Sequence, residues 1–93
     1  MITENTYFDG KVKSLGFVQA NQNLSVGVMA VGEYTFGTEA PERMTVVKGD
    51  LTVRVIGSEE WITYASGESF DVPRNSSFDL KVEQPTAYLC EYL

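Results

Sequence analysis

Two lysines separated by one residue, Lys11 and Lys13, have the chemistry to bind a small anion such as phosphate. On a β-strand, side chains two residues apart point to the same face, so the two ammonium groups would act together. Ser76, in the polar turn at residues 74–77, offers a hydroxyl and nearby backbone N–H groups to the same kind of ligand. Each feature also has an ordinary explanation, because lysines protect exposed strands and polar residues form turns. The sequence therefore predicts phosphate-binding candidates and leaves both interpretations open.

The chain has no histidine and a single cysteine, Cys90, which limits the nucleophilic chemistry it can perform. A thiol nucleophile normally needs a basic neighbour that lowers its pKa. One cysteine cannot form an intramolecular disulfide or a cysteine-based zinc site. Cys90 lies in an apolar segment at residues 88–93, which favours a small buried side chain. We therefore interpret Cys90 as a core residue.

The net charge of −6 excludes one class of partner. An acidic chain without a basic stripe repels the phosphate backbone, so we expect no nucleic acid polymer as partner. A small anion is still possible, because one or two lysines can hold it locally. The first residues have neither a basic start nor an apolar run, and no apolar stretch is long enough to span a bilayer. We expect a cytoplasmic protein without a membrane partner.

Short β-type runs separated by Gly, Pro, Asn and Asp dominate the 93 residues. In the clearest run, Phe78, Leu80 and Val82 alternate with polar residues, as in a half-buried strand. No window has a helical period, so we predict a single all-β domain over residues 1–93, a barrel or a sandwich. The expected strands are residues 11–18, 24–31, 34–38, 44–47, 51–56, 61–64, 70–72, 78–82 and 86–93.

Two segments resemble the paired motifs of the cupin superfamily. In the first, Gly32 precedes a pair, Glu42 and Gly49, that has the glutamate-to-glycine spacing of the motif. In the second, five residues separate Gly67 from Pro73, as the motif requires. The resemblance implies a cupin-type double-stranded β-helix, a jelly-roll-like barrel, with Glu42 facing its interior.

The positions at which cupins carry metal ligands hold other residues here. Registered on Glu42, the first two histidine positions of the motifs fall at about Phe36 and Thr38, and the third falls at Phe78. Iron, manganese and nickel prefer imidazole and carboxylate ligands, and Glu42 alone does not hold such a metal. We therefore expect no metal and no other cofactor, and the sequence excludes a metal-dependent cupin dioxygenase.

A closer resemblance runs in order along nearly the whole chain, through residues 7–14, 25–29, 32–36, 41–42, 44–46, 67–73 and 85–93. These segments resemble the short single-domain pyrimidine/purine nucleoside phosphorylases of bacteria. The resemblance implies phosphorolysis of purine and pyrimidine nucleosides to a free base and ribose 1-phosphate, with broad base specificity. Inorganic phosphate and nucleosides are then the expected partners, in a pentosyl transfer that needs no metal.

Cleavage of an N-glycosidic bond passes through a sugar with oxocarbenium character. In such a site Glu42 would accept hydrogen bonds from ribose hydroxyls or stabilise the positive charge, or else form a structural salt bridge. Tyr34 is the second catalytic candidate, and Tyr88 also combines an aromatic body with a polar tip. Phe78 would stack against a base or pack in the core. Thr38, at one of the replaced ligand positions, completes the substrate-binding candidates.

Two other classes of function fit the same barrel. A non-catalytic module that binds a sugar or nucleotide would show saturable nucleoside binding without turnover. A structural or assembly protein would show neither. We also expect a homodimer, because a small barrel with apolar, tyrosine-rich ends buries a modest core, and two-fold symmetry is the commonest arrangement.

Overall fold

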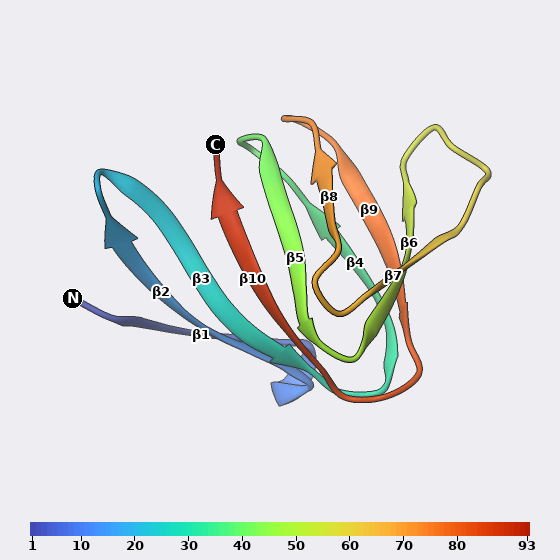
Figure 1. Ribbon diagram of the computed structural model, residues 1–93, viewed down its shortest axis with the longest axis horizontal. Coiled ribbons are helices and arrows are strands. Elements are labelled where there is room, and N and C mark those ends of the chain that lie inside the picture. Colours follow the sequence, from blue (N-terminus) through green and yellow to red (C-terminus); the bar gives the residue numbers. More distant parts are fainter.

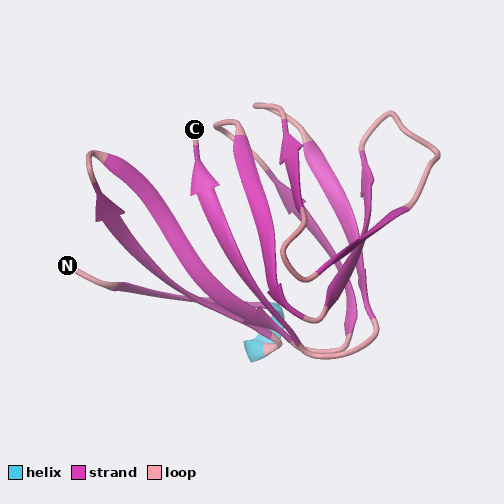
Figure 2. Cartoon of the chain, in the orientation of Figure 1, coloured by secondary structure: helices cyan, strands magenta, loops and turns pink.

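The computed structural model describes all 93 residues as an all-β protein of two sheets (Figures 1 and 2). The larger sheet has six strands in the order β1-β2-β3-β10-β5-β8, and the smaller has four in the order β4-β9-β6-β7. All strand pairs are antiparallel. The strands are β1 (Thr3–Tyr7), β2 (Val12–Gln19), β3 (Gln22–Met29), β4 (Gly32–Gly37), β5 (Glu42–Lys48), β6 (Asp50–Val55), β7 (Ile62–Ala65), β8 (Ser69–Val72), β9 (Ser77–Val82) and β10 (Thr86–Tyr92).

The core lies between the two sheets because the apolar residues of each strand alternate toward the other sheet. Met29 and Val46 of the larger sheet and Leu51 and Leu80 of the smaller one are at most 1% exposed. Figure 1 shows the outer part of β1, β2 and β3 extending away from β4, β9, β6 and β7. The smaller sheet therefore covers only part of the inner face of the larger one.

The all-β prediction is confirmed, but the two sheets are not joined into a closed barrel. Strands β1 and β8 are the edges of the larger sheet, and β4 and β7 are the edges of the smaller. In the larger sheet, the C-terminal strand β10 lies between β3 and β5. This insertion brings the end of the chain into the middle of the sheet.

The observed strands follow the predicted ones closely, with two differences. The strand predicted at residues 24–31 ends at Met29. Thr3–Tyr7, where no strand was expected, forms β1 and continues into a 3₁₀ turn at Phe8–Gly10. An edge strand that is exposed at four of its five positions carries no apolar alternation, so its sequence gives no strand signal. The structure contains no helix with the length and apolar character needed to cross a membrane.

Candidate functional site

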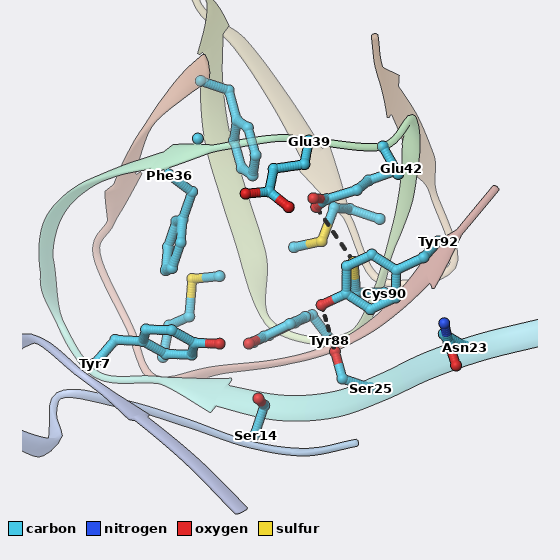
Figure 3. A pocket seen from close by; sticks show the side chains of 15 residues that line it. Tyr7, Ser14, Asn23, Ser25, Phe36, Glu39, Glu42, Tyr88, Cys90 and Tyr92 are labelled. Carbon is cyan, nitrogen blue, oxygen red and sulfur yellow. Dashed lines mark hydrogen bonds between the residues drawn. The ribbon is translucent and has the colours of Figure 1, made fainter. Parts of the chain in front are cut away.

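A cavity of about 470 Å³ opens between the two sheets (Figure 3). Its lining comes from the end of β1, from the inner faces of β2, β3, β5 and β10, from β4 and β9 of the smaller sheet, and from the loop before Glu42. We call this cavity the inter-sheet pocket; it is lined by Tyr7, Ser14, Asn23, Ser25, Met29, Phe36, Gly37, Glu39, Ala40, Glu42, Met44, Phe78, Tyr88, Cys90 and Tyr92.

Strand β10 supplies three polar side chains to one wall of the pocket. Because side chains alternate along a strand, Tyr88, Cys90 and Tyr92 all face inward. In Figure 3 the Tyr88 phenol points across the pocket toward Tyr7, above Ser14. These residues form a hydroxyl-rich floor.

Gly27 makes room for Tyr88. The two residues are paired across β3 and β10. A Cβ atom at position 27 would lie 2.6 Å from the Tyr88 hydroxyl oxygen and 2.7 Å from the Lys13 carbonyl oxygen. Only glycine at this position lets the Tyr88 ring lie flat over its neighbouring strand, so Gly27 positions the phenol in the pocket.

Glu42, the first residue of β5, places a half-buried carboxylate in the pocket, beside Cys90 and Tyr92 of the neighbouring strand β10. The Cys90 thiol donates a hydrogen bond to its Oε1 atom at 3.4 Å. Burial raises the pKa of the Glu42 carboxyl above its usual value of 4.5, and the hydrogen bond from Cys90 opposes this rise. The carboxylate is thus partly desolvated and has only a weak thiol donor as partner.

The groups next to Glu42 stay protonated at neutral pH. Burial, with the nearby Glu42 carboxylate, raises the pKa of the Cys90 thiol to about 12. Burial also raises the pKa of the Tyr92 phenol to about 12. The hydroxyls of Tyr92 and Ser25 lie 3.4 Å apart. A protonated Cys90 is a hydrogen-bond donor and a poor nucleophile, which agrees with its interpretation as a buried residue.

The charge of the pocket lining is negative. Glu39 and Glu42 are the only carboxylic acids that line it, and no lysine or arginine does. Figure 3 shows both carboxylates directed into the cavity. A carboxylate without a cationic neighbour favours a ligand that carries or develops positive charge.

An aromatic wall closes the side of the pocket opposite β10. Phe36 and Phe78 stack with ring centroids 5.9 Å apart. Tyr7 and Phe8 contact the Phe36 ring edge to face, at 5.6 and 5.4 Å. Phe8 and Asp9 hold left-handed backbone conformations, with φ of 52° and 57°, which is strained for a bulky residue such as phenylalanine. The strained turn keeps both rings against Phe36.

Three of the residues singled out in the sequence lie together in the pocket: Glu42, Phe78 and Tyr88. Lys11 and Lys13 are exposed and do not line it. Lys13 instead faces a groove on the outer side of the larger sheet, and Lys11 precedes β2.

The remaining candidates are tied to the backbone. The Tyr34 hydroxyl is buried and donates to the Ala30 carbonyl at 2.6 Å. The Thr38 hydroxyl donates to the Pro73 carbonyl at 2.7 Å and accepts from the Ser76 N–H at 3.0 Å. None of these three residues lines the pocket. Their hydroxyl and amide groups fix loops, and their proposed contact with a ligand stays a prediction.

Several polar residues of the pocket were not among the site residues predicted from the sequence. The alternation of β10 could have identified Tyr92 and Cys90 as inward-facing neighbours of Tyr88. Ser14 and Ser25 had no such signal, because buried serines look like any polar residue of a strand. These residues are Tyr7, Ser14, Asn23, Ser25, Tyr92 and Cys90, of which Cys90 was interpreted from the sequence as a core residue. Nowhere do three or more His, Cys, Asp or Glu side chains gather as a metal site.

Comparison with known proteins gives consistent results. The family model for pyrimidine/purine nucleoside phosphorylase matches residues 2–92. A pyrimidine/purine nucleoside phosphorylase of Vibrio atlanticus is 67% identical over 93 residues, with both chains covered completely. A crystal structure of a protein of unknown function from Vibrio parahaemolyticus superimposes with a TM-score of 0.98 at 68% identity, covering 100% of this chain and 99% of that one.

More distant structures share the fold. A cupin superfamily protein of Desulfitobacterium hafniense superimposes with a TM-score of 0.75 at 12% identity, over 96% of this chain and 83% of that one. At this identity the likeness concerns the fold alone, and it shows that the two-sheet arrangement is cupin-like.

Proposed function

Because the chain belongs to the pyrimidine/purine nucleoside phosphorylase family, we propose that it cleaves purine and pyrimidine nucleosides with inorganic phosphate. The products are a free base and ribose 1-phosphate. The family name supports the reaction class, and the inter-sheet pocket supplies the site. The volume of the pocket, about 470 Å³, is in the ordinary range for small-molecule sites.

The reaction exchanges one bond at the anomeric carbon for another. The C1′–N bond breaks and its electron pair leaves with the base, while a phosphate oxygen forms the new C1′–O bond. The proton that hydrogen phosphate brings ends on the base. The sugar carries positive charge between these events, so stabilising that charge lowers the barrier.

The observation that carries the proposal is the Glu42 carboxylate, half-buried and without a cationic partner. Its raised pKa reflects the cost of leaving an anion partly desolvated. A sugar with oxocarbenium character compensates this charge only in the transition state. Glu42 therefore stabilises the transition state more than the bound nucleoside, which is the requirement for catalysis.

Bound phosphate requires hydrogen-bond donors, and the pocket supplies uncharged hydroxyl groups as donors. Repulsion from Glu39 and Glu42 places the anion at the hydroxyl floor, near Tyr7, Ser14 and Tyr88. Burial raises the pKa of the Tyr88 phenol, so this group stays protonated and donates. Hydrogen bonds to a charged acceptor are stronger than neutral ones, so several hydroxyls together can replace a lysine clamp.

Broad base specificity follows from the chemistry of the aromatic wall. Phe36 and Phe78 present faces and edges without hydrogen-bonding groups. Stacking tolerates every base because each has a π-face, whereas edge contacts would select one. The wall therefore accepts purines and pyrimidines alike.

Three finer assignments belong to the same proposal. The likeness to a cupin structure supports the double-stranded β-helix as the fold class. The protein acts as a homodimer, as its small core leads us to expect. A cytoplasmic location remains a prediction from the sequence.

The test is release of free base from inosine and from uridine by the purified protein, with and without phosphate, in the presence of a chelator. We expect release that needs phosphate and is unaffected by the chelator. Glu42→Gln should abolish most of it, and Glu33→Gln, at an exposed position outside the pocket, should not. Saturable nucleoside binding without turnover would replace the proposal with a binding module.

A further inference from the structure

The Glu39 carboxylate points into the inter-sheet pocket, yet the proposed reaction gives it no bonding partner (Figure 3). Glu39 lies on the loop between β4 and β5 and is exposed, so it stands where the pocket opens to solvent. It takes part in no ion pair and no hydrogen bond within the chain. Both oxygens of the carboxylate are therefore free to accept hydrogen bonds from a ligand.

The loop that carries Glu39 is held at both ends by main-chain hydrogen bonds. At its start the Thr38 N–H donates to the Ser76 carbonyl at 2.9 Å, and at its end the Leu93 N–H donates to the Pro41 carbonyl at 2.8 Å. The proline ring also fixes its own φ. The backbone under Glu39 is thus in place before a ligand binds, which lowers the entropy cost of a contact through its side chain.

The neighbours of Glu39 place it beside the sugar of a bound nucleoside. Phe36, three residues earlier, belongs to the aromatic wall that stacks the base in the proposed function. Glu42, three residues later, is the carboxylate that faces the positive charge at C1′. Figure 3 shows the Glu39 side chain between those of Phe36 and Glu42. A group between the base and the charged carbon is close to C2′, the sugar carbon bonded to C1′.

The two carboxylates of the pocket differ in what they can still accept. Glu42 is half-buried, and its Oε1 atom already accepts a hydrogen bond from the Cys90 thiol at 3.4 Å. A partly desolvated charge acts strongly on a nearby positive charge, so Glu42 suits the charge that develops at C1′. The free carboxylate of Glu39 is a strong acceptor for a hydroxyl group, so it suits the sugar hydroxyls.

A hydrogen bond from the 2′-hydroxyl would strengthen as the reaction proceeds. Positive charge at C1′ withdraws electrons from C2′, which makes the hydroxyl on C2′ a better donor. Hydrogen bonds to the hydroxyl at this position strengthen in the transition state of glycoside cleavage in the same way. An interaction that is stronger in the transition state than in the bound substrate raises kcat.

We infer that Glu39 accepts a hydrogen bond from the 2′-hydroxyl of the bound nucleoside and thereby favours ribonucleosides over 2′-deoxyribonucleosides. The inference rests on the proposed function, because it concerns the sugar whose bond to the base is cleaved. Glu39 is then the residue that reads the sugar, whereas the aromatic wall tolerates every base.

The test compares adenosine with 2′-deoxyadenosine, which differ only in the 2′-hydroxyl. We expect Glu39→Ala to lower kcat/KM for adenosine by about 10- to 100-fold, mainly through kcat, and to leave that for 2′-deoxyadenosine within about twofold. The change in the ratio of the two values is the readout, because the two nucleosides differ in intrinsic reactivity. Glu39→Gln keeps one neutral acceptor oxygen and should lose less than Glu39→Ala.

The matched control is Glu33→Ala, which removes the same charge from an exposed position outside the pocket and should leave the ratio unchanged. Circular dichroism verifies that each variant is folded. An equal loss with both nucleosides would mean that Glu39 acts through the fold, and no loss with adenosine would mean that it does not contact the sugar. Either result would overturn the inference and leave phosphorolysis standing.

Failure of the proposed function gives a different result, since the wild type would then cleave neither nucleoside. Binding tests Glu39 in that case, by titration calorimetry with the same two nucleosides. Glu39→Ala should weaken the binding of adenosine about tenfold and leave that of 2′-deoxyadenosine unchanged. Equal changes in the two Kd values would overturn the inference.

Discussion

Adding one methyl group at Gly27 should impair catalysis without unfolding the protein. A Cβ atom there lies 2.6 Å from the Tyr88 hydroxyl oxygen, whereas ordinary contacts begin at 3.4 Å. The phenol must therefore move by about 0.8 Å, the difference between these distances, and the Lys13 carbonyl oxygen, at 2.7 Å, must also give way. A displacement of about 1 Å in a positioned group can cost about 100-fold in rate. We expect Gly27→Ala to reduce kcat/KM by about 10- to 100-fold.

The assay compares phosphate-dependent base release by Gly27→Ala with that of a matched variant. Gly16→Ala adds the same methyl group to the neighbouring strand β2, where the nearest atom is 3.7 Å away, and should leave activity unchanged. Overpacking costs about 1–3 kcal/mol, a fraction of the roughly 5–15 kcal/mol of a folded domain. Thermal unfolding should show Gly27→Ala folded with a lowered Tm.

Tyr88→Phe distinguishes the contribution of the Tyr88 hydroxyl to activity from that of its ring. In that background the hydroxyl contribution is already lost, so adding Gly27→Ala should cost less activity than it does alone. A folded Gly27→Ala protein with unchanged kcat/KM would refute the role of Tyr88 as a positioned phosphate donor.

Further outcomes are expected at Glu42, Cys90 and Phe36. Glu42→Gln should lower kcat/KM by about 100- to 1,000-fold, and the wild-type rate should rise with pH through the raised pKa of Glu42, because the ionised form is active. At pH 7 the free energy of unfolding of Glu42→Gln should exceed that of the wild type, by at most about 1 kcal/mol because the carboxyl is half-exposed. Its Tm should therefore be higher. The raised pKa makes Glu42 stabilise the native state only at low pH, so this advantage should vanish below pH 4.5. Iodoacetamide at neutral pH should leave activity intact, because burial raises the pKa of the Cys90 thiol to about 12. Cys90→Ala should lower kcat/KM about tenfold, because it removes the hydrogen bond to Glu42, whereas Cys90→Ser should keep that hydrogen bond and the activity. Phe36→Ala should raise the KM of inosine and uridine by similar factors, about 5- to 100-fold, and a loss confined to one of them would contradict base stacking.

The sequence was sufficient for the elements whose pattern is local. The alternation of Phe78, Leu80 and Val82 predicted β9, and the short runs at residues 44–47 and 51–56 predicted β5 and β6. The edge strand β1 was missed because its exposed polar residues lack a period. The pairing of β10 with both β3 and β5 depends on contacts between distant segments, which no local pattern records.

The site was predictable only where a residue type carried its own signal. Glu42 was found through its place in a motif, and its neighbours on β10 could be found by counting alternate residues. Tyr34 was chosen for its polar tip, which in the structure is bonded to a main-chain carbonyl. Lys11 and Lys13 were chosen for their charge, and the structure places them outside the pocket. The charge of a side chain does not indicate which face of the sheet it occupies.

Attack of phosphate on the sugar is the central step of the proposed reaction, and the stoichiometry of phosphate consumption tests it most directly. Inosine is incubated with the protein and labelled phosphate, and free base and sugar phosphate are counted in the same sample. The account predicts one phosphate bound to C1′ for each base released. Base released without any phosphate consumed would mean that water attacks the sugar, and would contradict it.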